Sequence, residues 1–83
     1  MDIININPED KQEYLNKNNP FREILNIKER RICIHCEKWF TVEDFIVIQD
    51  DDGEEYISCP NYPDCDGTIT DWFEHYTIPD PLN

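Results

Sequence analysis

The chain has 83 residues and a formal net charge of −12, with 19 Asp and Glu against seven Lys and Arg. A chain of this length is expected to form one compact domain with a small core, and such domains usually need a metal or disulfides for stability. Residues 1–15 lack a basic segment followed by an apolar run, and no apolar stretch approaches the length of a membrane span, about 18 residues. We therefore expect a cytoplasmic protein without a membrane segment, in which thiols stay reduced.

The first third of the chain predicts short helices. Residues 1–6 are expected to form a loose tail. Asn7 suits a helix N-cap, Pro8 suits the first helical position, and the acids that follow complement the helix dipole. This helix should end before Pro20, which disfavours helical backbone at the preceding residue. A second short helix is indicated by apolar residues at helical spacing: Phe21, Ile24 and Leu25.

Strand patterns begin near residue 31. Residues 32–36 read as a short strand that leads into a tight turn, or knuckle, and residues 59–65 read as a second knuckle rich in proline. Gly53 ends a turn that can join two strands into a hairpin. The predicted strands after the first knuckle are 45–49, 55–58 and 68–73.

These elements predict a small, metal-stabilised α+β fold. We expect a zinc ribbon with a three-stranded antiparallel sheet and two knuckles, preceded by the short helices. The expected parts are an N-terminal helical extension (1–30), the ribbon (31–76) and an extended C-terminal tail (77–83).

Four cysteines carry the predicted chemistry. Cys33 and Cys36 form a C-x₂-C pair, and after 22 residues Cys59 and Cys65 form a C-x₅-C pair. A hairpin between the pairs can return the second knuckle to the first, so that four sulfurs surround one tetrahedral Zn²⁺. The alternatives are disulfides in an oxidising compartment, thioredoxin-like redox chemistry, and iron in a rubredoxin-like site.

The two histidines could also take part in metal binding or acid–base chemistry. His35 lies inside the first knuckle and could compete as a ligand, although four cysteines already complete a tetrahedron. His75 follows Glu74, which could indicate acid–base chemistry, but a solvated pair is the simpler interpretation. With no open coordination position for a water molecule, we expect no enzymatic activity.

The segment Cys59-Pro60-Asn61-Tyr62-Pro63-Asp64-Cys65, after an earlier Cys33-x-x-Cys36, resembles the zinc-ribbon repeats at the C-terminus of bacterial DNA topoisomerase I. The resemblance covers residues 31–73 and implies a four-cysteine zinc site in an antiparallel ribbon. It also implies binding of single-stranded DNA or contact with RNA polymerase. Where family ribbons carry basic residues, this chain has acids: Asp50, Asp51, Asp52, Glu54, Glu55, Asp64 and Asp66.

The acids are concentrated in residues 31–83, which hold thirteen Asp and Glu against two Lys and Arg. Such a charge should repel nucleic acid and attract basic protein surfaces. We therefore predict a zinc-binding module that docks on a basic protein. The alternatives are single-strand nucleic-acid binding and acidic mimicry of nucleic acid. Aromatic residues that could serve as core or as interface are Trp39, Phe40, Phe45, Tyr56, Tyr62, Trp72, Phe73 and Tyr76.

Overall fold

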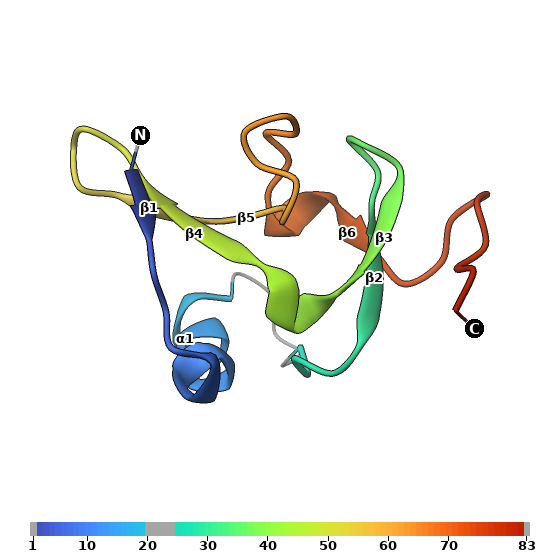
Figure 1. The fold of residues 1–83 in the computed structure, drawn as a ribbon, viewed down its shortest axis with the longest axis horizontal. Coiled ribbons are helices and arrows are strands. Elements are labelled where there is room, and N and C mark those ends of the chain that lie inside the picture. The colour runs from blue at the N-terminus through green and yellow to red at the C-terminus, as the bar shows by residue number, and fades with distance from the viewer. Residues whose placement is uncertain (1, 20–24, 83) are drawn as a thin grey trace.

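Two three-stranded antiparallel sheets and one short α-helix make up the α+β fold of the computed structural model, which describes residues 2–19 and 25–82 (Figure 1). The first sheet has the order β1-β4-β5, with β1 (Asp2–Ile4), β4 (Ile46–Gln49) and β5 (Glu55–Ser58). The second has the order β3-β2-β6, with β3 (Lys38–Thr41), β2 (Arg30–Cys33) and β6 (Trp72–Phe73).

The N-terminal residues belong to a sheet, so the prediction of a loose tail is wrong. Strand β1 pairs antiparallel with β4, and Ile3 lies opposite Ile48. This pairing occupies an edge of β4 that would otherwise leave backbone groups without partners. Ile4 packs against the core, while Ile3 is 53% exposed.

The first predicted helix is confirmed. A 3₁₀ turn at Pro8–Asp10 leads into helix α1 (Lys11–Asn18), and Asn19 has extended backbone, as expected before a proline. Leu15 is fully buried, and the Lys11 ammonium lies 4.8 Å from the centre of the Phe45 ring. These contacts fasten α1 to the start of β4. Two residues of the second predicted helix, Phe21 and Ile24, lie outside the described residues.

The predicted hairpin is confirmed as β4 and β5. Gly53 has a φ of +88°, a conformation that favours glycine in the connecting turn. The side chain of Asp50 accepts hydrogen bonds from the backbone amides of Asp52 and Glu54, which closes the turn.

The prediction of one ribbon sheet is wrong, because its strands are divided between two sheets. Of the strand predicted at 68–73, Thr68 forms a single antiparallel bridge with Ser58 of β5, and Trp72 and Phe73 pair with β2. A 3₁₀ turn at Ile69–Asp71 replaces the rest, because the side chains of Thr68 and Asp71 form a reciprocal capping box. The sequence analysis also missed β3, which forms a hairpin with β2.

The C-terminal segment is not a free tail. The Trp39 indole donates a hydrogen bond of 2.9 Å to the carbonyl of Ile78, and Arg30 forms a bidentate pair with Asp80 at 2.9 and 3.0 Å. The Asp80 side chain is only 3% exposed. This segment therefore lies beside the sheet β3-β2-β6 (Figure 1), against the face that carries Trp39 and Arg30.

Within residues 2–19 and 25–82, no helix combines the length and apolar character that crossing a membrane requires.

Candidate metal centre

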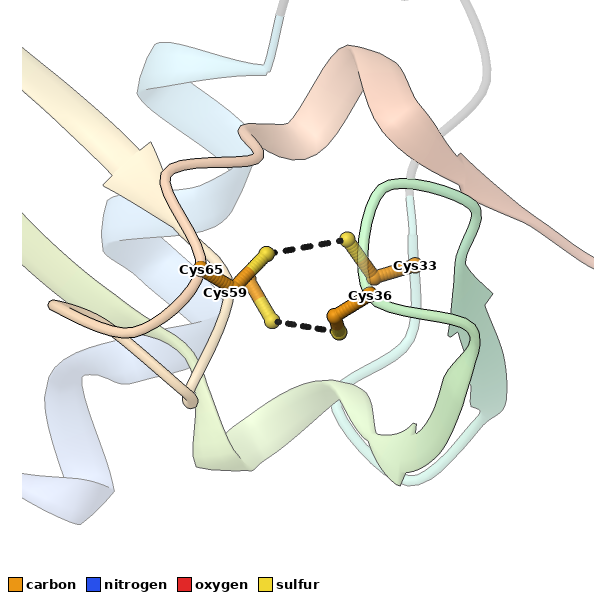
Figure 2. A group of neighbouring side chains, drawn as sticks. All are labelled: Cys33, Cys36, Cys59 and Cys65. Carbon is orange, nitrogen blue, oxygen red and sulfur yellow. Dashed lines mark hydrogen bonds between the residues drawn. The ribbon is translucent and has the colours of Figure 1, made fainter.

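The four cysteines come from two loops that face each other (Figure 2). Cys33 ends β2 and Cys36 lies in the turn toward β3, while Cys59 follows β5 and Cys65 closes the next loop. All four sulfurs lie within 4.8 Å of one another. Two of these distances, from Cys33 to Cys65 and from Cys36 to Cys59, are 3.7 Å.

These distances fit a tetrahedral metal and not a disulfide. With Zn–S bonds of about 2.3 Å, a regular tetrahedron has sulfur–sulfur edges of about 3.8 Å. A disulfide bond is about 2.05 Å long, and all four cysteines are free. A donor set of four thiolates in this geometry suits zinc or iron. The cluster is therefore compatible with a structural metal site.

Each sulfur accepts a hydrogen bond from the backbone amide two residues further along the chain. For Cys59 and Cys65 the donors are Asn61 at 3.5 Å and Gly67 at 3.4 Å. For Cys33 the donors are the amide of Cys36 and that of His35, two residues along, and for Cys36 the donor is the amide of Lys38. The two loops thus present their sulfurs in the same way, and donors of this kind stabilise the charge of thiolate ligands.

Burial acts on the thiols unequally. It raises the pKa of Cys33 to about 11, and it raises the pKa of Cys59 further. For Cys36, burial also opposes ionisation, but hydrogen bonds from Asn61 and Lys38 help to outweigh it and lower the pKa. A bound cation would favour the thiolate form at each position, and binding would release protons.

Two residues of the site were missed by the sequence analysis as participants. The side-chain amide of Asn61 lies 3.5 Å from the sulfur of Cys36, so it donates across the two loops. A Cβ atom at Gly67 would lie 2.8 Å from the sulfur of Cys33 and 3.3 Å from that of Cys65. The cluster therefore requires a residue without a side chain at Gly67. The available signal was the position of this glycine two residues after a cysteine.

The loop backbones hold further turn bonds. The amide of Glu37 donates to the carbonyl of Cys33 at 2.7 Å, and Glu37 has a φ of +58°, which is unusual for a residue with a side chain. The amide of Cys59 donates to the carbonyl of Gly67 at 3.0 Å, which closes the base of the second loop. These backbone hydrogen bonds help to position the sulfurs independently of a bound metal.

Neither histidine belongs to the sulfur cluster within the described residues. His35 lies beside it, with Nδ1 3.7 Å from the sulfur of Cys65 and Nε2 3.2 Å from Asp66. Glu74 pairs with Arg31 at 3.0 Å. His35 thus connects the cluster to an exposed carboxylate, and His75 is an exposed side chain.

The aromatic residues divide between core and surface. Phe40 and Trp72 meet edge to face with ring centres 4.9 Å apart, and both are buried. Phe73 and Tyr76 are 44% and 41% exposed. Phe45 belongs to the core, while three others are partly exposed: Trp39, Tyr56 and Tyr62.

Comparison of the chain with protein-family models, with curated proteins and with solved structures gives no match. The resemblance to the topoisomerase ribbons therefore stays a prediction.

Proposed function

We propose that this chain is a zinc-stabilised binding module in which Cys33, Cys36, Cys59 and Cys65 hold one structural Zn²⁺. The observation that carries the proposal is the arrangement of four sulfurs at tetrahedral spacing, each with a backbone amide donor. Bound there, zinc would join the β2–β3 hairpin to the loop after β5. The metal has no catalytic role in this proposal, because four cysteines fill its coordination positions.

The finer assignment is a zinc ribbon of the topoisomerase I type. Its support is the second loop, where the matching segment Asn61-Tyr62-Pro63 lies between Cys59 and Cys65. The side chain of Asn61 donates a hydrogen bond to the sulfur of Cys36 in the first loop, so this residue of the motif connects the two cysteine loops.

The proposed activity is docking on a basic protein surface. Residues 31–83 contain thirteen Asp and Glu but only two Lys and Arg, and a four-thiolate zinc site adds two negative charges. Exposed aromatic side chains such as Tyr76 supply contact area of the kind that interfaces favour.

Metal analysis of the reduced, purified protein tests the zinc site. We expect one zinc ion per chain, loss of zinc and of sheet structure in Cys65→Ser, and retention of both in the control Asp64→Asn, whose side chain is exposed. Stoichiometric iron would contradict the choice of metal. A metal-free protein with an unchanged amide NMR spectrum would contradict the structural role.

A further inference from the structure

A groove lies between Trp39 of β3 and residues 74–80 of the chain. It has a volume of about 370 Å³, at the lower end of the range for ligand pockets. This size suits one long side chain better than a cofactor. The groove is lined by Trp39, Glu74, His75, Tyr76, Pro79 and Asp80.

The walls of this groove are held in place without a partner. Trp39 is tied to the C-terminal segment through its hydrogen bond to Ile78, and Asp80 is held by both nitrogens of the Arg30 fork. A site whose walls are already ordered loses less conformational entropy when a ligand binds. The groove is therefore a preformed feature of the fold.

The charges at the rim favour a cation. The guanidinium of Arg31 forms ion pairs with two carboxylates, those of Glu29 and Glu74. Arg30 is engaged by Asp80, so each of the two carboxylates that line the groove, Glu74 and Asp80, has an arginine partner within the chain. The Glu74 side chain remains 59% exposed. Glu74 is therefore accessible to a second cation, and the thirteen acids against two basic residues in residues 31–83 attract cations to this part of the chain.

We infer that this groove binds an arginine side chain from a basic segment of a partner protein. A guanidinium is flat, stacks on Trp and Tyr rings, and pairs with a carboxylate through its fork. Trp39 and Tyr76 provide the rings and Glu74 provides the carboxylate. The inference rests on the proposed function, since it names the partner chemistry of the docking module.

A peptide titration tests the groove. The probe is a peptide of alternating arginine and glycine, and the control peptide has citrulline, a neutral isostere, at every arginine. Both are added to protein whose zinc content and amide spectrum have been measured. We expect saturable shifts of the Trp39 indole and Tyr76 ring signals with the arginine peptide alone. Equal shifts with citrulline, or none with arginine, would overturn the inference.

Matched variants separate the groove from the general negative charge. Tyr76→Ala and Glu74→Gln should each weaken binding about two- to fivefold, the range expected for one exposed cation–π contact or ion pair. Asp51→Asn removes the same charge from the hairpin tip and should leave affinity within error. An equal loss in Asp51→Asn and Glu74→Gln, with no effect of Tyr76→Ala, would show diffuse attraction and overturn the site.

The two proposals fail separately. A folded, zinc-loaded protein that ignores the arginine peptide overturns the groove and leaves the metal site standing. A folded protein without zinc that still binds the peptide supports the groove and overturns the metal site.

Discussion

Gly67 lies closer to the sulfur cluster than a residue with a side chain could. Its position is required by space and not by backbone conformation, since the Cβ of any other residue would meet the sulfur of Cys33 at 2.8 Å. Gly53 is the opposite case, because its φ of +88° requires glycine while the nearest neighbouring atom is 4.0 Å from the added Cβ. Of the two glycines in the chain, Gly67 is therefore required by lack of space and Gly53 by backbone conformation.

Gly67→Ala should disturb the metal centre. We expect a stability loss of about 1–3 kcal/mol from overpacking, with weaker zinc binding because the sulfurs must move apart. The control Gly53→Ala should cost about 1–2 kcal/mol through backbone strain and leave zinc affinity unchanged. Chelator competition and urea unfolding measure both quantities. Equal zinc affinity in the two variants would contradict the role given to Gly67.

The ion pair between Asp80 and Arg30 should make the stability of the fold depend on pH. The hydrogen bond from Arg30 lowers the pKa of Asp80 below its usual value of 3.8. A carboxyl with a depressed folded pKa adds stability above its unfolded pKa, and that stability is lost as the pH falls through the folded pKa. Asp80→Asn should therefore lower the melting temperature at neutral pH, and the difference from the wild type should close below the folded pKa. A difference that persists unchanged at strongly acidic pH would contradict this account.

At the scale of elements, helix α1 is part of the same core as the sulfurs. Leu15 is fully buried in the cluster that also contains Cys33, Cys59 and Cys65. The charged anchor Lys11 adds a hydrogen bond of 3.1 Å to the carbonyl of Phe45. An isolated helix of this length would be marginal in water, so packing of this one face holds it in place.

Leu15→Ala should cost about 2–5 kcal/mol of unfolding free energy, because it leaves a cavity in a small core. Lys17→Ala, on the exposed face of α1, should stay within about 0.5 kcal/mol, since its pair with Glu13 is solvent-exposed. Urea denaturation of the zinc-loaded proteins provides the comparison. Similar midpoints for Leu15→Ala and the wild type would show that α1 does not contribute to the core.

For the whole molecule, electrostatics separates this chain from the ribbons that it resembles. Of the two basic residues in residues 31–83, Arg31 is enclosed between Glu29 and Glu74 with a side chain that is 10% exposed. Lys38 is thus the exposed cation of this part of the chain. Binding of a polyanion depends mainly on such cations, because each contact releases counterions.

We therefore expect no saturable binding of labelled oligothymidine at about 0.15 M ionic strength, where charges are screened over about 8 Å. Stacking of bases on exposed rings, about 1–3 kcal/mol per base, acts in the opposite direction. Fluorescence anisotropy measures the balance, and the variant Asp51→Lys/Asp52→Lys should raise any residual affinity. Saturable micromolar binding by the wild type, lost in Tyr56→Ala, would restore the nucleic-acid function.

Local patterns alone were enough to predict that helical backbone begins at Pro8, where a 3₁₀ turn leads into α1, and to predict the hairpin around Gly53 and the four cysteines as a set. Each depends on neighbours in the chain: a capping position, a turn that tolerates positive φ, and the spacing of two cysteine pairs. The tertiary structure decided which strands pair. It placed β1 on β4, gave β6 to the second sheet, and laid Asp80 on Arg30 across 50 positions of the chain. These contacts depend on distant partners that compete for the same backbone edges and charges, and no local pattern records that competition.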